Sequence, residues 1–212
     1  MKKKKISLLL GFGAILAFVL WTLLIKTIDI KPIGPMGSAV GFSSLNGAFH
    51  EFTGVHLWLY NLTDLLSLIP ILLMLSFASL GFIQLIKRKS LQKVDFDIIA
   101  LGGFYAVLAM VFLFFEVFVI NYRPVLINGI LEASYPSSTT LLVMCVMLAA
   151  AMQFKKRILN QKLRKAAVLT ASAFTVFMVL ARLISGVHWL TDIIGGILLS
   201  SGLVLIYYSI KE

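Results

Sequence analysis

The stretch Ala181-Arg-Leu-Ile-Ser-Gly-Val-His-Trp-Leu-Thr-Asp192 lies between two long apolar runs, residues 166–184 and 193–210. A stretch between two such runs is expected at a membrane surface, where the chain leaves one span and enters the next. It nevertheless holds an arginine, a histidine and an aspartate. Ionisable side chains at the edge of a membrane are costly, so they are functional candidates by default.

Three side chains of this stretch suit phosphate chemistry. Gly186 can turn the chain, after which His188 and Asp192 are four residues apart and share one face of a helix. Helical side chains lean toward the N-terminus, so the Asp192 carboxylate leans toward the His188 ring. A carboxylate on one ring nitrogen fixes the tautomer and leaves the other nitrogen free to react. Arg182 adds a planar cation, so we interpret the group as a nucleophilic histidine beside an anion-binding arginine.

The composition of the whole chain indicates a polytopic membrane protein. Of the 212 residues, 60% are hydrophobic and 13% are charged, and the mean hydropathy is +0.99. A soluble domain of this size does not need so much apolar residue. We therefore predict an all-α membrane fold in which residues 1–212 form a single domain.

Six apolar runs are long enough to cross a bilayer as helices. The predicted spans are residues 6–25, 65–86, 98–120, 137–154, 166–184 and 193–210. The strictly apolar part of the fourth run is short, so the start of that helix is expected to line a wet cavity. Pro70 is expected to kink the second span, and Asp64 at its outer end is interpreted as solvated or as a helix cap. The segment 49–60 is expected to lie along the interface as an amphipathic helix.

The positive charges predict the orientation of these spans. Six spans place both termini on one side, and fifteen of the nineteen lysines and arginines fall on that side. The positive-inside rule therefore places both termini in the cytoplasm and the stretch 181–192 at the outer face. Topology thus explains the net charge of +10, which argues against a nucleic-acid partner. The short hydrophilic loops suggest the plasma membrane of a bacterium.

Two further polar segments are expected to meet the first at the outer face. Residues 116–124 carry Arg123, and residues 135–140 place a run of hydroxyl side chains at the start of the fourth helix. Such residues cap helix N-termini, and a helix N-terminus with free N–H groups is also an anion site. Two arginines, this N-terminus and a histidine with its carboxylate would together bind a phosphate and attack it. The simpler alternative is that the hydroxyl groups only cap the helix.

These segments resemble the motifs of the type 2 phosphatidic acid phosphatase superfamily of membrane lipid phosphatases. The family carries Lys-x6-Arg-Pro, Pro-Ser-Gly-His and Ser-Arg-x5-His-x3-Asp. Arg123-Pro124 matches the end of the first motif, and Pro136-Ser137 matches the start of the second. Arg182, His188 and Asp192 match the third motif with its spacing intact. The third motif is therefore the specific part of the resemblance.

The resemblance implies a phosphatase that acts on a lipid phosphate or diphosphate and requires no metal or other cofactor. By the family pattern His188 would be the nucleophile and would pass through a phosphohistidine, with Asp192 holding its ring. The residues expected to bind the phosphate oxygens are Arg123, Arg182, Ser137, Ser138 and Thr139.

The chain departs from the family pattern at four positions. Glu116 stands where the family has lysine, Ser138 where it has glycine, and Ala181 where it has serine. Thr139 replaces the histidine that serves the family as the general acid for the leaving alkoxide. A threonine hydroxyl cannot do this near neutral pH, and general acid catalysis is worth about 10²- to 10⁴-fold. The replacement would weaken the enzyme without removing phosphate binding.

Three residues are candidate substitutes for the missing acid. Glu116 lies seven residues before Arg123, two turns along one helical face, and a buried carboxyl there could hold a proton. We favour the alternative in which Glu116 forms an ion pair with Arg123 or Arg182. His50 or His56 could fold over the site from the first outer loop, although a lone loop histidine is usually a surface residue.

The leading prediction is a membrane phosphatase for lipid-linked phosphates. A prenyl diphosphate is favoured over a phosphatidate-like monoester, because phosphate leaves more readily than an alkoxide. The alternative is a non-catalytic relative that binds a lipid phosphate or serves as a transport or assembly partner. A metal site on His188 and Asp192 is disfavoured, because the two nearby arginines would repel a cation.

Overall fold

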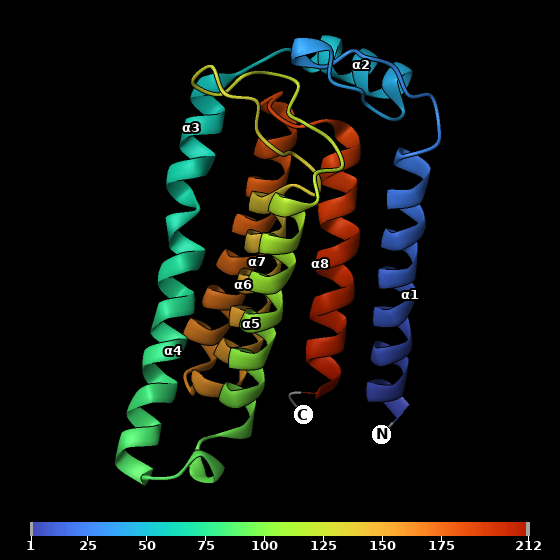
Figure 1. Ribbon diagram of the computed structural model, residues 1–212. Coiled ribbons are helices and arrows are strands. Elements are labelled where there is room, and N and C mark those ends of the chain that lie inside the picture. Colours follow the sequence, from blue (N-terminus) through green and yellow to red (C-terminus); the bar gives the residue numbers. More distant parts are fainter. Residues whose placement is uncertain (1, 211–212) are drawn as a thin grey trace.

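The computed structural model describes residues 2–210, which form a bundle of roughly aligned helices (Figure 1). In chain order the helices are α1 (Lys2–Ile25), α2 (Ser43–Thr53), α3 (Leu57–Leu66), α4 (Leu68–Arg88), α5 (Phe96–Val117), α6 (Ser138–Arg157), α7 (Gln161–Ile184) and α8 (Leu190–Ile210). Six segments are long and apolar enough to cross a membrane, with α3 and α4 counted as one. The prediction of an all-α protein with six spans is confirmed.

The two ends of the bundle carry different segments. The start of α1 and the end of α8 lie together with the α4–α5 and α6–α7 connections, whereas α2 lies across the opposite end (Figure 1). We call these the terminal end and the α2 end. The basic segments 87–93 and 155–165 therefore lie at the terminal end, beside the four lysines that begin α1. Lys211, which was also counted for orientation, lies outside the described residues.

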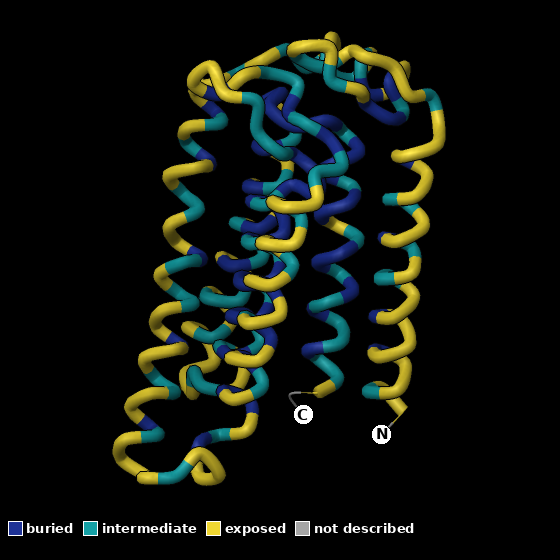
Figure 2. Tube along the Cα trace, viewed as in Figure 1, coloured by how far each residue is buried: buried dark blue, intermediate teal, exposed yellow. Residues whose placement is uncertain are grey.

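Helix α6 lies inside the bundle. In its most apolar 18-residue window 61% of the residues are buried, against 17% in α1 and 11% in the α3–α4 segment. Figure 2 shows the exposed class running along most of α1 and α4. Helix α6 packs against α7 and α8 and also meets α4 and α5. Protein rather than lipid surrounds α6, so the short apolar run of this span is sufficient.

The second span is broken into two helices near Pro70. Helix α3 ends at Leu66, and α4 begins at Leu68 after the single residue Ser67. Proline has no N–H to donate to the carbonyl four residues earlier, and its ring crowds that carbonyl. Four residues before Pro70 is Leu66, so the break falls where this effect acts. The helix is interrupted at Ser67, near the predicted kink, and the helical region begins eight residues earlier than expected, at Leu57.

The predicted single interfacial helix over residues 49–60 is wrong. Helix α2 ends at Thr53, because Gly54 adopts φ 66°. Helix α3 begins at Leu57, after three intervening residues, and runs in a different direction. Helix α2 alone crosses the end of the bundle, while α3 continues into the membrane-spanning segment (Figure 1). Both α2 and α3 are amphipathic, but Gly54 separates them into two helices.

A buried carboxylate joins α5 to α6 at the terminal end. Asp97 is 2% exposed and lies 2.7 Å from Lys156 Nζ and 2.8 Å from Arg157 Nη2. Burial of a charge is tolerated when a partner of opposite charge and hydrogen bonds accompany it. The pairing holds the start of α5 against the end of α6.

Candidate active site

A tight turn between α7 and α8 places His188 inside the protein. Gly186 in this turn has φ 70°, a left-handed conformation that glycine adopts readily. A Cβ at this position would lie 2.0 Å from the carbonyl oxygen of Gly54. The backbone N–H of His56 donates to the Ser185 carbonyl at 2.9 Å. The segment between α2 and α3 therefore packs directly on the turn, and His188 is only 3% exposed.

Gly186→Ala is expected to destabilise the protein by at least about 2 kcal/mol, because alanine is strained at this φ and its methyl group overlaps the Gly54 carbonyl. Thermal unfolding in detergent measures the effect. Gly103→Ala in α5 is the matched control, since a Cβ there meets no atom within 4 Å. We expect the control to melt at or slightly above the parent temperature. Equal melting temperatures for the two variants would contradict the described turn.

The Asp192 carboxylate is held beside His188 by neighbouring donors. Oδ2 accepts the backbone N–H of Trp189 at 3.0 Å, and Oδ1 accepts Nδ2 of Asn121 at 3.3 Å. His188 Nδ1 lies 3.7 Å from Asp192 Oδ2, which is beyond hydrogen-bond distance. The two side chains therefore lie as the i, i+4 spacing predicted, at a distance that a small shift of the ring would close to a hydrogen bond.

The opposite nitrogen of the His188 ring faces an arginine. Arg123 Nη1 lies 3.3 Å from His188 Nε2. A guanidinium can only donate, so Nε2 is the accepting nitrogen and the ring proton is on Nδ1, toward Asp192. Burial, with the charges of Arg123 and Arg182 in addition, lowers the pKa of His188 well below its usual value. His188 is therefore neutral near pH 7, with the lone pair of Nε2 directed at the anion-binding side chain.

The ion pair of Arg123 is made with Glu132, and the predicted pair with Glu116 is wrong. Arg123 Nε lies 3.0 Å from Glu132 Oε2, although the N–H is not directed well enough for a hydrogen bond. The Arg123 backbone N–H also donates to the Glu132 carbonyl at 3.0 Å. The α5–α6 connection folds back on itself to bring these residues together, which spacing along one helix could not indicate. Glu116 makes no ion pair among residues 2–210.

Arg182 is the most deeply placed cation of the site. It is 1% exposed, and Nη1 donates to the Thr63 hydroxyl at 3.0 Å and to the Tyr60 carbonyl at 3.4 Å. The Tyr60 ring lies 4.5 Å from the Arg182 guanidinium and 5.7 Å from that of Arg123. Both guanidinium groups thus lie over the face of the Tyr60 ring. The negative potential of that face attracts each cation and partly offsets the repulsion between the two arginines. The Arg182 Nε remains unpartnered within the described residues, so one donor is available to a ligand.

The start of α6 meets the same turn through its backbone. The Ser137 N–H donates to the Asp192 carbonyl at 3.1 Å, and its hydroxyl caps the helix by accepting the Thr140 N–H at 3.4 Å. The capping alternative therefore holds for the side chain of Ser137. Ser138 and Thr139 occupy the first helical positions, where backbone N–H groups have no partner within the helix. These two N–H groups are the anion-binding feature that this helix offers.

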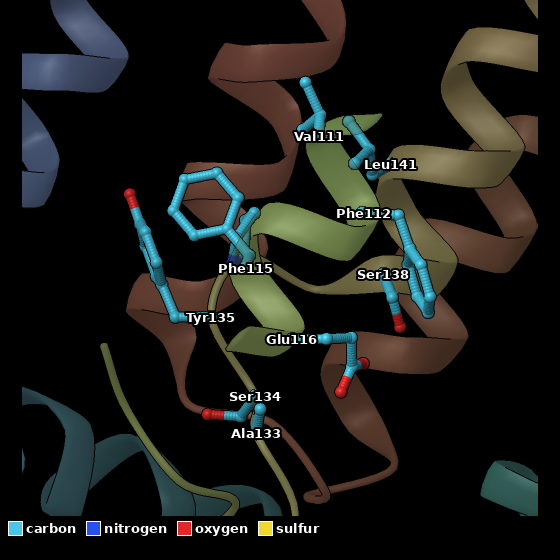
Figure 3. Close-up of a pocket in the computed structure, with 10 residues that line it drawn as sticks. Val111, Phe112, Phe115, Glu116, Ala133, Ser134, Tyr135, Ser138 and Leu141 are labelled. Carbon is cyan, nitrogen blue, oxygen red and sulfur yellow. The ribbon is translucent and has the colours of Figure 1, made fainter. Parts of the chain in front are cut away.

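Glu116 lies at the edge of the site. It lines a small cavity of about 20 Å³ together with Ser134, Tyr135 and Ser138, which Figure 3 shows in close-up. It also lines a larger cavity of about 500 Å³ that reaches Arg123 and Glu132. The structure thus places Glu116 near the start of α6 and near Arg123, but α5 ends at Val117, so the predicted helical face shared by Glu116 and Arg123 is wrong.

His50 and His56 both support the loop that covers the site. The His50 ring lies 5.5 Å from the Trp189 ring, and burial lowers the pKa of His50. His56 Nε2 lies 2.9 Å from the Thr53 carbonyl oxygen. Within residues 2–210, no contact joins either ring to His188 or to an arginine. Their described contacts thus connect α2, the α2–α3 segment and the α7–α8 turn.

Sequence reasoning missed five residues that support the site. They are Tyr60, Thr63, Asn121, Glu132 and Ser134. Asn121 was visible as an amide beside Arg123, and Ser134 as a hydroxyl just before the second motif. Tyr60 and Thr63 had no such signal, because the expected boundary left them outside the second span. Among the described residues, no group of three or more His, Cys, Asp or Glu side chains is arranged to hold a metal ion.

Comparisons with known proteins show a matching family and a matching fold. The PAP2 superfamily matches residues 102–212, the half of the chain that holds all three motifs. The crystal structure of a transmembrane PAP2 type phosphatidylglycerolphosphate phosphatase from Bacillus subtilis has the same fold. It superposes with a TM-score of 0.63 at 18% identity, over 94% of this chain and 93% of that one. No curated protein matches the chain.

The family match includes Arg123 and the third motif, with His188 and Asp192 at their expected spacing. The similar fold extends over nearly the whole chain, including α1 to α4, which the family match does not cover. This six-span protein belongs to the PAP2 superfamily, as the resemblance predicted.

Proposed function

We propose that this protein is a membrane phosphatase that removes phosphate from a lipid phosphate or diphosphate through a phosphohistidine at His188. The observation that carries the proposal is the orientation of the buried His188 ring. Its Nε2 accepts from Arg123, while its Nδ1 points to Asp192. A histidine that only packs or binds an anion has no need of a carboxylate behind it, whereas a nucleophile does.

The proposed reaction uses the residues described above. Arg123, Arg182 and the first N–H groups of α6 hold the phosphate oxygens beside Nε2. Nε2 attacks phosphorus, the leaving group departs, and Asp192 stabilises the positive charge that develops on the imidazole. Water then cleaves the phosphohistidine and releases phosphate. None of these steps requires a metal ion.

The surroundings of the site suit a lipid substrate. Beside Thr139, a cavity of about 530 Å³ opens between the α3–α4 segment, α5 and α6, and its walls are mostly apolar. A hydrocarbon chain can lie there while the phosphate reaches the arginines. We assign the α2 end to the outer face of a plasma membrane, since the basic loops gather at the terminal end.

Release of inorganic phosphate by the detergent-purified protein tests this function. The panel consists of a phosphatidate, phosphatidylglycerol phosphate and a prenyl diphosphate, each without added metal. We expect release from at least one of them. Binding of the lipid phosphate without any release would favour the non-catalytic alternative, which the replacement of the family acid by Thr139 supports.

A diphosphate is expected to be cleaved at least about tenfold faster than a monoester that carries the same lipid chain, because its leaving phosphate needs less protonation than an alkoxide. Initial rates of phosphate release at matched lipid concentration measure the ratio. Thr139→His is the matched variant, since it restores an imidazole at the family position. We expect it to raise the monoester rate more than the diphosphate rate. Equal rates for the two substrates in the parent protein would exclude this preference.

A further inference from the structure

Asp64 is a carboxylate beside the site that lies outside the three motif segments and makes no ion pair among residues 2–210. Asp64 lies on α3 near its end and is exposed in the absence of lipid. No hydrogen bond or ion pair to its side chain occurs among residues 2–210. It does not cap a helix through its side chain, because only its backbone carbonyl accepts from Ser67. The Asp64 carboxylate is therefore free to face a bound substrate.

Asp64 lines the cavity into which we place the lipid. The polar residues that line this cavity are Asp64, Ser67, Ser138 and Thr139, together with Tyr105 of α5. Most of the other lining residues are aliphatic or aromatic side chains of α4, α5 and α6. Asp64 and Thr139 therefore border one space from two different helices. Thr139 is the position at which the family carries its acid, so a carboxyl in the same space is well placed to act instead.

The position of Asp64 relative to the phosphate site follows from Arg182. Thr63, the preceding residue, accepts a hydrogen bond from Arg182 at 3.0 Å, and the charge of Asp64 acts on the same guanidinium. A phosphoryl group held by Arg182 and attacked by His188 must point its leaving oxygen away from Nε2. The hydrocarbon chain on that oxygen has to enter the apolar cavity. The leaving oxygen therefore lies at the mouth of this cavity, which Asp64 borders.

We propose that Asp64 is the general acid for the leaving oxygen, in place of the family histidine that Thr139 has replaced; this rests on the proposed phosphatase function. In the first step the bond between Nε2 and phosphorus forms and the phosphorus–oxygen bond breaks. The electron pair goes to the leaving oxygen, and the carboxyl proton goes with it to give the lipid alcohol.

In the second step water attacks the phosphohistidine and loses a proton to the solvent, and the Asp64 carboxylate regains its proton from the solvent. The new phosphorus–oxygen bond forms as the phosphorus–nitrogen bond breaks, and the electron pair returns to Nε2. Phosphate leaves, and both side chains regain their starting protonation states. The sum of the two steps is hydrolysis of the ester by one water molecule. Only the first step depends on how basic the leaving group is.

Leaving-group dependence tests this role. Asp64→Asn is compared with the parent protein on a short-chain phosphatidate, whose leaving alkoxide needs a proton, and on p-nitrophenyl phosphate, whose leaving group does not. We expect about a 10²-fold or larger loss on phosphatidate and less than about a threefold change on the aryl ester. The retained aryl phosphatase activity also shows that the variant is folded. The double variant Asp64→Asn with Thr139→His should release phosphate from phosphatidate at least about tenfold faster than Asp64→Asn alone, because the new imidazole can supply the proton.

Several results would overturn the assignment. An equal loss on both substrates would show a binding or structural role for Asp64. A selective loss in Glu116→Gln, with Asp64→Asn unaffected, would make Glu116 the acid. A parent protein that cleaves diphosphates and the aryl ester but no phosphatidate would have no working acid. A parent that releases phosphate from none of these compounds refutes the phosphatase function itself, so the two failures are distinguishable.

Discussion

Replacing His188 with alanine is expected to lower phosphate release by at least about 10⁴-fold, because the atom that bonds to phosphorus is removed. The two arginines and the start of α6 stay in place, so the variant should still bind lipid phosphate. Phosphate release and lipid binding are measured on the same detergent-purified sample. Loss of turnover with retained binding separates a nucleophile from a residue that only shapes the site.

Lys162→Ala is the control for this experiment. Lys162 is exposed in the first turn of α7 at the terminal end, far along the bundle from the site. Its removal should leave both the turnover and the melting temperature unchanged. If His188→Ala kept more than about a tenth of the parent rate while it remained folded, the phosphohistidine mechanism would be wrong.

Asp192→Asn is expected to lower kcat by about 10²- to 10⁴-fold with a smaller change in KM. The amide has the same shape, but it brings an NH₂ group toward donors that now approach the carboxylate, the Trp189 N–H and Asn121 Nδ2. It also removes the negative charge that stabilises the imidazolium in the transition state. Initial rates over a range of substrate concentrations give kcat and KM separately.

The melting temperature of the Asp192→Asn variant is the accompanying measurement. The substitution removes a buried charge but leaves one of the two donors, the Trp189 N–H or Asn121 Nδ2, without an acceptor, which costs about 1–3 kcal/mol. We therefore expect a small fall in the melting temperature beside the large fall in kcat. A variant whose activity and stability both fall strongly would indicate that Asp192 mainly holds the α7–α8 turn, through its bond to the Trp189 N–H. Asp192→Ala, which removes both the charge and the acceptors, should lose activity and stability together.

The local parts of this site could be predicted from the sequence. His188 and Asp192 face each other because a helix repeats every 3.6 residues, and that rule needs only their spacing. Gly186 at the turn and Ser137 at the start of α6 follow from the backbone preferences of glycine and of capping residues. The six spans follow from the length of apolar runs against the thickness of a bilayer. All of these depend on residues close together in the chain.

The contacts of the arginines could not be predicted in this way. Arg123 forms an ion pair with Glu132, because the α5–α6 connection folds back on itself. Arg182 donates a hydrogen bond to Thr63, which lies in a helix more than a hundred positions away in the chain. The pair expected between Arg123 and Glu116 assumed that both residues lie on one helical face. Helix α5 ends at Val117, and the loop after it brings Glu132 to Arg123 instead. The place of Asp64 beside the cavity likewise depends on how α3 packs against α7 and how α4 packs against α6.

The sequence by itself therefore determined the membrane class, the number of spans and the identity of the proposed nucleophile with its carboxylate, because these rest on hydropathy and on short helical spacing. Tertiary structure alone decided which groups pair with each arginine, which helices form the lipid cavity and which carboxylate borders it. The physical reason is that helix packing brings together side chains whose separation along the chain carries no information about their contact.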